Sequence, residues 1–207
     1  MTSAYKAIKN AALSPSSTLV VVGAGGGLGQ YATQYGLASG ARVIGIDTGA
    51  QKHSLVESFG AEFVDFKQTT NLVSTIQELT SGGADAVIVA AGHSSGFAQA
   101  ASMLRIGGTL CCIGIPPGGG RIETPVSEIV IKGLKIQGNL VGNLKECLEA
   151  VELVRAGRVR PKIYVRPFED LPKVYEELEK GDIASRVVLK VGDDPGPGLG
   201  SGFKSRL

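Results

Sequence analysis

The sequence predicts an α/β fold in which helices cover both faces of a doubly wound parallel sheet. Short apolar runs alternate with segments of helical periodicity, and glycines follow the points where several of these helices should end. This alternation is typical of βαβ units, which place successive strands side by side in one parallel sheet. Hydrophobic residues make up 43% of the 207 residues, which is enough for a buried core.

Six strands are expected before residue 142. The first is apolar after Thr18, as expected for a strand that is covered on both faces. The expected strands are residues 18–22, 42–47, 62–66, 85–90, 109–115 and 134–141. The expected helices are residues 28–39, 51–59, 96–104 and 127–132, with a further helix that Asn71 caps and that ends at Leu79. The pair Gly107-Gly108 is expected to turn the chain into the fifth strand.

The pattern changes after Gly142. We expect a helix over residues 144–156, a strand near 162–165 and a final strand over 186–191. Between these strands, a helix over 171–180 is expected to be capped by Asp170 and stopped by Gly181. The last segment, residues 193–207, is rich in glycine, proline and serine, and we expect it to be a disordered tail.

Composition and charge favour a cytoplasmic protein without nucleic-acid or membrane partners. The net charge is only +2, and no block of like charge occurs. No apolar stretch approaches the length of a membrane span, and the first ten residues do not resemble a signal peptide. We interpret Cys111, Cys112 and Cys147 as reduced, packed thiols, with the first two on opposite faces of a strand.

A glycine-rich turn after the first strand predicts a phosphate-binding site. The sequence LVVVGAGGGLGQYATQYG has the order strand, turn, helix that a dinucleotide-binding turn requires. A strict G-x-G-x-x-G is absent, and the best register places Ala24, Gly26 and Gly29 at the three positions. The helix N-terminus beyond the turn would offer free N–H groups to phosphate oxygens. Taken alone, such a turn can also be no more than a tight connection.

An acidic residue at the end of the second strand strengthens this prediction. Asp47 lies eighteen residues beyond Gly29, near the spacing expected for an acid that binds the adenosine ribose. Its carboxylate would accept hydrogen bonds from both ribose hydroxyls and repel a 2′-phosphate, which favours NAD over NADP. Lys52 can reach the same ribose, although a solvated surface lysine is an equally simple interpretation.

Together these motifs resemble the zinc-containing medium-chain alcohol dehydrogenases, with the fungal tetrameric branch nearest. The segments GAGGGLG, GID, GGTLCCIGIP and LVGNLKECLEAVELVRAGRVRP contribute to a resemblance that covers roughly residues 2–192. It implies a dinucleotide-binding Rossmann domain over residues 1–141, with a six-stranded doubly wound parallel sheet. It also implies that residues 142–192 are the C-terminal segment of an incomplete catalytic lobe, a partial α+β segment.

The resemblance implies a set of cofactor-binding residues. The turn that would cradle the diphosphate consists of Gly23, Ala24, Gly25, Gly26, Gly27, Leu28 and Gly29. Asp47 and Lys52 would hold the ribose, and Arg186 would reach a phosphate from the returning C-terminal segment. Thr2 matches a threonine that contacts the nicotinamide. The residues that would line the nicotinamide pocket are Ile113, Gly114 and Ile115.

The chain also departs from the family pattern. The catalytic zinc of the family is held by two Cys and one His from an N-terminal lobe, and we expect no zinc ligands in this chain. His53 is expected to face solvent. His93 follows the fourth strand near the expected nicotinamide position, where a pocket residue is the alternative to the favoured ordinary loop histidine. Leu144 stands where the fungal enzymes often have Arg.

The predicted function is therefore the NAD(H)-binding portion of an alcohol-dehydrogenase-like oxidoreductase. In the full-length family a hydride passes between nicotinamide and an alcohol or aldehyde; we expect the isolated chain to be inactive, with no catalytic residue of its own. A truncated fragment of a longer gene is one origin of such a chain, and a non-catalytic NAD(H)-binding or regulatory module is the alternative. The resemblance also makes a homo-oligomer through the sixth strand, residues 134–141, plausible.

A complete short-chain dehydrogenase is the rival enzyme class. Gly23, Gly27 and Gly29 also fit a G-x-x-x-G-x-G turn. Such enzymes need a Tyr-x-x-x-Lys pair well after the turn, and the only pattern of this kind, Tyr5 to Lys9, precedes it. This reading is therefore disfavoured.

Overall fold

The computed structural model describes residues 1–192, so the tail expected at 193–207 lies outside the described residues. By packing, the chain divides into two compact units. Among the described residues, the first comprises residues 1–162 and 184–186, and the second comprises residues 163–183 and 187–192. Each unit is described by itself below.

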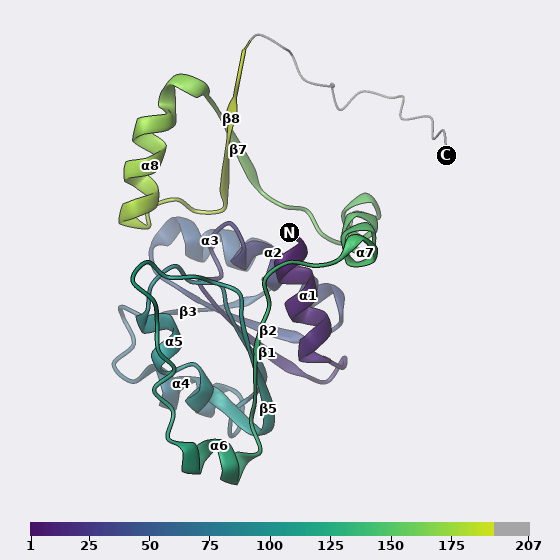
Figure 1. The fold of residues 1–207 in the computed structure, drawn as a ribbon, viewed down its shortest axis with the longest axis vertical. Helices are drawn as coiled ribbons and strands as arrows, with labels where there is room; N and C mark the ends of the chain where they lie inside the picture. Colours follow the sequence, from purple (N-terminus) through teal and green to yellow (C-terminus); the bar gives the residue numbers. More distant parts are fainter. Residues whose placement is uncertain (193–207) are drawn as a thin grey trace. The chain divides into compact units, whose positions relative to one another are not determined.

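A six-stranded parallel sheet forms the centre of the first unit (Figure 1). The strands are β1 Thr18–Val22, β2 Arg42–Asp47, β3 Glu62–Asp65, β4 Ala84–Val89, β5 Leu104–Cys112 and β6 Lys135–Gly138. They lie in the order β3-β2-β1-β4-β5-β6, and every neighbouring pair is parallel. The chain therefore builds outward from β1 in one direction and from β4 in the other, which confirms the doubly wound sheet.

The first unit contains seven α-helices among its described residues. They are α1 Thr2–Ala11, α2 Gly29–Ala38, α3 Ala50–Ser58, α4 Leu72–Leu79, α5 Ser95–Ala98, α6 Val126–Lys132 and α7 Leu144–Arg155. Asn71 caps α4 as expected, because its side chain accepts a hydrogen bond from the amide of Ser74. The helix expected over 96–104 is shorter: α5 is followed by a 3₁₀ turn at Ala101–Met103.

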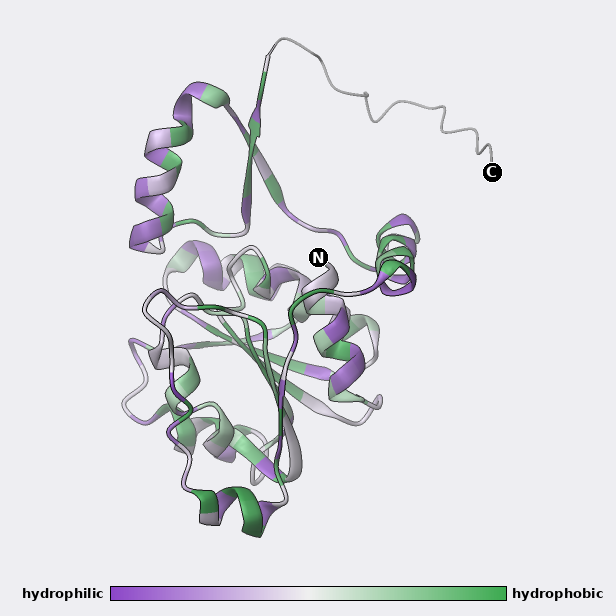
Figure 2. Cartoon of the chain, viewed as in Figure 1, coloured by the Kyte–Doolittle hydropathy of each residue, from purple (hydrophilic) through white to green (hydrophobic). Residues whose placement is uncertain are grey.

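The sheet is covered on both faces. Leu19 and Val21 belong to one buried cluster, and Val20 and Val22 belong to the other, as the alternation of side chains along a strand requires. Cys111 and Cys112 likewise pack against different clusters, as expected. Figure 2 shows the apolar character concentrated along the strands at the centre of the unit. The two clusters explain why residues 19–22 of β1 are all apolar instead of alternating with polar residues.

The fifth strand differs from the one expected over 109–115. It begins at Leu104 and ends at Cys112, with a register shift opposite Ala84 and Ala86. The four residues between the two paired segments include Gly107, whose left-handed φ of 75° fits the irregularity. The glycine pair therefore lies inside the strand and does not precede it. The sixth strand is also shorter than expected, four residues in place of residues 134–141.

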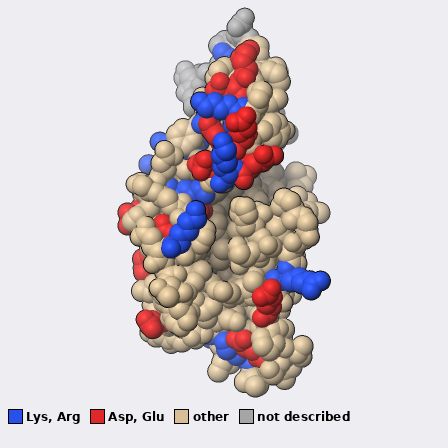
Figure 3. All heavy atoms as spheres, turned by 90° about the vertical axis from the view of Figure 1, so that its left-hand side faces the viewer, with Lys and Arg blue, Asp and Glu red and all other residues tan. Residues whose placement is uncertain are grey.

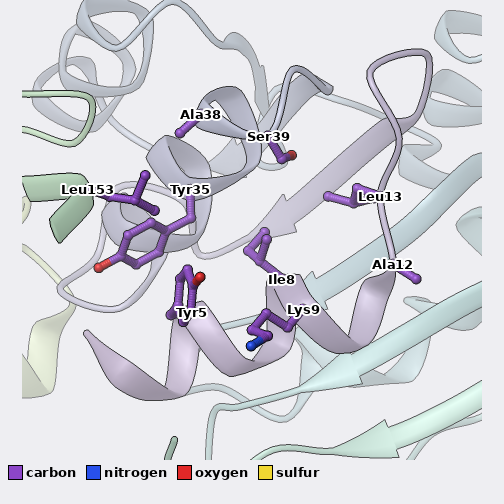
Figure 4. A pocket seen from close by; sticks show the side chains of 9 residues that line it. All are labelled: Tyr5, Ile8, Lys9, Ala12, Leu13, Tyr35, Ala38, Ser39 and Leu153. Atoms are coloured by element: carbon purple, nitrogen blue, oxygen red, sulfur yellow. The ribbon is translucent and has the colours of Figure 1, made fainter. Parts of the chain in front are cut away.

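Helix α1 was not expected from the sequence. Its buried residues Ala4, Ala7, Ile8 and Ala11 follow the spacing of one helix face, but alanine is a weak hydrophobic signal. The helix packs on α2, where the ring of Tyr5 meets the edge of Tyr35 with centroids 5.2 Å apart (Figure 4). This contact helps to hold α1 against α2 within the first unit.

Helix α7 belongs to the first unit by packing. Its start carries a capping box, in which the Asn143 side chain accepts from the amide of Glu146 and the Glu146 carboxylate accepts from the amide of Asn143. Glu146 and Glu149 then form ion pairs with Lys6 and Lys9 of α1. The packing boundary therefore falls after residue 162, whereas the expected division of the chain by lobes at residue 142 stays a prediction.

The second unit contains a two-stranded sheet and one α-helix among its described residues. β7 is Ile163–Pro167, a 3₁₀ turn covers Phe168–Asp170, α8 is Leu171–Lys180 and β8 is Arg186–Lys190. Gly181 ends α8 in a left-handed conformation as expected, but Asp170 occupies the N-cap position without a side-chain hydrogen bond. Charged side chains of both signs are mixed over α8 (Figure 3). Within residues 1–192, none of the helices combines the length and apolar character of a membrane span.

Candidate dinucleotide site

A tight glycine turn joins β1 to α2. The amides of Gly23 and Ala24 both donate to the carbonyl of Ile46 in β2, over 2.8 and 3.2 Å. Gly23 has a left-handed φ of 82°, and a Cβ on Gly29 would overlap the carbonyl oxygen of Gly23. Glycine at these positions therefore permits the start of α2 to approach the end of β1 closely.

Three consecutive amides at the start of α2 have no backbone acceptor among the described residues. They are the N–H groups of Gly27, Leu28 and Gly29. Free amides at a helix N-terminus, reinforced by the positive end of the helix dipole, are suited to bind a phosphate group. This end of α2 can therefore hold an anion.

The carboxylate of Asp47 lies at the tip of β2 beside the turn. The residue is only 6% exposed. Its Oδ2 accepts from the amide of Gly25 at 3.0 Å, and its Oδ1 accepts from the amide of Thr48 and from Lys52 Nζ, both at 2.9 Å. Because a carboxylate offers about four acceptor positions, Asp47 can still accept from a ligand hydroxyl.

Lys52 reaches Asp47 by crossing over Gly25. Its side chain is 14% exposed in the ion pair. A Cβ on Gly25 would come within 2.5 Å of the Lys52 Cβ, so the missing side chain at Gly25 makes room for the lysine stem. Lys52 is therefore a packed partner of Asp47 and not a solvated surface lysine.

Arg186 approaches the turn from the C-terminal part of the chain. A Cβ on Gly27 would lie 2.9 Å from its Nη2, so the guanidinium group lies beside the free amides. The positive charge of Arg186 also acts on the nearby N-terminus: burial lowers the pKa of the Met1 ammonium group, and the charge of Arg186 lowers it further. Arg186 and Lys52 thus place positive charge on two sides of the turn, which favours an anionic ligand.

The loops that follow β1, β4 and β5 meet at Ala91. A Cβ on Gly23 would come within 2.9 Å of the Ala91 backbone, and one on Gly114 would overlap the Ala91 carbonyl. Ile113 and Gly114 follow the end of β5. Their amides both donate to the carbonyl of Val89, at 3.0 Å. The Ile113 side chain is buried in the core, whereas Ile115 is 79% exposed. Of these two side chains, only Ile115 is open to a ligand.

Thr2 lies in the first turn of α1, half-buried. Leu144, which begins α7, is 76% exposed. Neither residue is drawn into the hydrogen bonds of the glycine turn. The structure therefore brings together the turn, Asp47, Lys52 and Arg186, but not Thr2.

Two residues that hold the turn were missed in the sequence analysis. The amide of Ser185 donates to the carbonyl of Gly25 over 2.6 Å. Gln30, which is fully buried, binds the backbone of Lys162 through both ends of its side-chain amide. Serine and glutamine are common in loops and on helices, so neither carries a signal that could have identified it.

Two surface hollows, of about 300 and 540 Å³, lie along α1 away from the turn. Tyr5 and Leu153 line both hollows, of which Figure 4 shows the smaller, and no residue of the glycine turn lines either. The candidate dinucleotide site therefore lies at the carboxyl ends of the central strands and is separate from these two hollows.

The described residues do not fit a catalytic zinc. Within residues 1–192, no three His, Cys, Asp or Glu side chains gather as a possible metal site. Burial, the largest cause, raises the pKa of the Cys111 thiol to about 11, which disfavours the thiolate that zinc requires. His53 stacks on Phe63 and pairs with Glu57, and His93 is exposed.

The described residues do fit a dinucleotide. The amides of Gly27 to Gly29 are free of backbone acceptors, a buried carboxylate lies beside the turn, and the Arg186 guanidinium lies next to Gly27. Sheet order and turn together define a Rossmann-fold protein. The chain belongs to the zinc-binding dehydrogenase family, whose pattern matches residues 27–156.

Two fungal relatives are similar over most of the chain. Alcohol dehydrogenase 1 of Emericella nidulans is 40% identical over 190 residues, which are 90% of this chain and 54% of that protein. An alcohol dehydrogenase of Schizosaccharomyces pombe is 39% identical over 89% of this chain and 53% of its own length. The chain therefore spans about half the length of the curated relatives it matches.

Solved structures agree with this assignment. The alcohol dehydrogenase of the archaeon Aeropyrum pernix is 33% identical, with a TM-score of 0.82 over 90% of this chain and 54% of that chain. Acetophenone reductase of Geotrichum candidum, solved in complex with NAD, is 26% identical, with a TM-score of 0.76 over 93% and 54% of the two chains. Both support the fold described above.

The geometry of the turn predicts unequal costs for two glycine substitutions. Gly29→Ala should lower the free energy of unfolding by about 1–3 kcal/mol or more, because its methyl group meets a fixed backbone oxygen. Gly27→Ala should cost less than about 1 kcal/mol, because the atom nearest its methyl group belongs to the Arg186 guanidinium, the end of a flexible side chain that can move aside. Urea denaturation measures both, with Gly92→Ala, which meets nothing within 4 Å, as the control. Equal losses for the two variants would contradict the described turn.

Proposed function

We propose that this chain binds NAD(H) and is the cofactor-binding portion of an alcohol-dehydrogenase-like oxidoreductase. The observation that carries the proposal is the buried carboxylate of Asp47, which lies beside a turn with three free amides. A diphosphate and a ribose are the two parts of a dinucleotide that such groups recognise. The fungal relatives are alcohol dehydrogenases, which suggests an alcohol or aldehyde as the substrate of the whole protein.

Each part of the cofactor has a proposed contact. The amides of Gly27 to Gly29 and the guanidinium of Arg186 bind the diphosphate, because both present N–H donors to anionic oxygens. Asp47 accepts from a hydroxyl of the adenosine ribose through its remaining acceptor position, and Lys52 is the second partner of this ribose. Gly114 and Ile115 lie beside the nicotinamide, at the edge of the sheet where α/β proteins bind ligands.

The bound nicotinamide would supply the hydride chemistry, and the residues of this chain would orient it. The described residues offer no group that could polarise a substrate carbonyl in place of the absent zinc ligands. We therefore propose that the chain alone binds NAD(H) without oxidising alcohols. Cysteine usage makes the cytoplasm the proposed compartment.

The first test is the preference between the two nicotinamide dinucleotides. Calorimetric titration should show NADH binding about tenfold or more tightly than NADPH, because a 2′-phosphate would meet the Asp47 carboxylate. Asp47→Ala is the control. It should narrow or reverse the difference, because the variant removes the repulsion and leaves the Lys52 charge uncompensated. Equal affinity of the wild type for both cofactors, or no binding, would sink the proposal.

The second test is turnover. Purified protein supplied with zinc, NAD and ethanol should produce no NADH above the blank, measured by absorbance at the nicotinamide band. Asp47→Ala serves again as a control, since an activity that it abolishes would belong to this site and not to a contaminant. Turnover by the wild type that the variant lacks would show that the chain is active alone.

We also propose that two copies associate through β6. This strand lies at the edge of the sheet, and several residues of α6, of β6 and of the segment just after β6 expose large apolar side chains. These are Val126, Val130, Ile131, Ile136, Leu140 and Val141. An open strand edge bordered by apolar surface favours pairing with another chain.

Light scattering after size exclusion should therefore report a dimer or a larger assembly for the wild type. Ile136→Lys should shift the mass toward the monomer, because a buried lysine at the interface is unfavourable. Phe66→Lys, which follows the opposite edge strand β3, is the matched control and should leave the mass unchanged. A monomeric wild type would contradict the proposal.

A further inference from the structure

Ser185 has a backbone conformation that side chains rarely adopt. Its φ is 70°, in the left-handed region, and the residue is only 3% exposed. A non-glycine residue persists in this region only where its surroundings hold it there. At Ser185 the strained conformation directs the amide to the carbonyl of Gly25, over 2.6 Å.

This bond completes a two-sided restraint on Gly25. The amide of Gly25 donates to Asp47, and its carbonyl accepts from Ser185. Glycine has more backbone freedom than any other residue, so a glycine-rich turn needs outside contacts to keep its amides in one arrangement. The hydrogen bonds from Gly25 to Asp47 and from Ser185 to Gly25 supply such outside contacts to the turn.

Ser185 is itself held by hydrogen bonds to other residues of the first unit. Its hydroxyl group donates to the carbonyl of Lys162, which also accepts from Gln30 Nε2 at 3.1 Å. The amide of Lys162 donates back to Gln30 Oε1 at 2.8 Å. Because Gln30 lies in α2, the helix that begins at the turn also holds the residue that restrains the turn.

We propose that Ser185 is a positioning residue for the diphosphate of the cofactor. By holding Gly25, it keeps the free amides of Gly27 to Gly29 aimed at one place before the ligand arrives, and it sets Arg186, the next residue, beside Gly27. Because the turn is already ordered in the free protein, binding the diphosphate does not have to offset the entropic cost of ordering it. This inference rests on the proposed binding of NAD(H).

Two substitutions of Ser185 separate its backbone from its side chain. Ser185→Ala keeps the strain but loses the hydroxyl anchor, so the backbone should relax and release Gly25. Ser185→Gly also loses the hydroxyl, but glycine adopts a φ of 70° readily and keeps the amide in place. Calorimetry should show NADH and ADP-ribose binding about fivefold to tenfold more weakly to the Ala variant, as for one lost hydrogen bond. The Gly variant should bind within about twofold of the wild type.

Adenosine, which lacks the diphosphate, distinguishes positioning from general damage. Its affinity, measured by competition, should be the same in the Ala variant and the wild type, because Asp47 keeps its bonds to Thr48 and Lys52. Ser81→Ala is the matched control. Ser81 has a similar φ of 53° but lies in the turn after α4, so its substitution should lower stability without changing NADH affinity.

The outcomes decide between the two proposals. If the wild type binds NADH and the Ala variant binds it equally well, or loses adenosine to the same degree, the role of Ser185 is overturned and the proposed function stands. If the wild type does not bind NADH, both are overturned. Should the Ala variant not fold, hydrogen exchange of the wild type replaces it: the Ser185 amide should exchange slowly and more slowly still with NADH, and fast exchange in both states overturns the role.

Discussion

The close approach of the start of α2 to the end of β1 is the constraint on which the site depends. A side chain at Gly29 would overlap the carbonyl of Gly23, so the two segments meet only through glycine. This approach brings the helix N-terminus to the tip of β2, where Asp47 binds the amide of Gly25. The turn is itself fixed to β2, because the amides of Gly23 and Ala24 donate to the carbonyl of Ile46.

The sequence allowed prediction of the parts of the fold that a two-sided sheet dictates. Strands β1 and β2 lie where they were expected, because their central residues, 19–22 and 43–46, are buried and consist only of apolar residues and one glycine. Where the signal comes from glycine or alanine, prediction was weaker. Gly107 indicated the start of a strand but lies at an irregularity within β5, and the alanines of α1 gave too little hydrophobic contrast to indicate a helix. Tertiary packing decides both cases.

At the site, the spacing between Gly29 and Asp47 indicated that two segments would meet, and the structure brings the turn and the carboxylate together. Local spacing carries this information because β1, α2 and β2 are consecutive. Ser185 and Arg186 reach the same turn from more than 150 residues away. Arg186 could be named only through a family resemblance, and Ser185 could not be named at all, since its contribution is a backbone amide that any residue but proline has.

The path of the chain gives the restraint at Gly25 a wider consequence. The chain leaves the first unit at Lys162 and returns at Ala184, and Ser185 binds the backbone of Lys162 on its return. Both ends of the excursion are therefore fastened at α2, next to the glycine turn. The restraint on Gly25 through Ser185 is therefore built from residues of the first unit alone, namely Lys162 and Gln30.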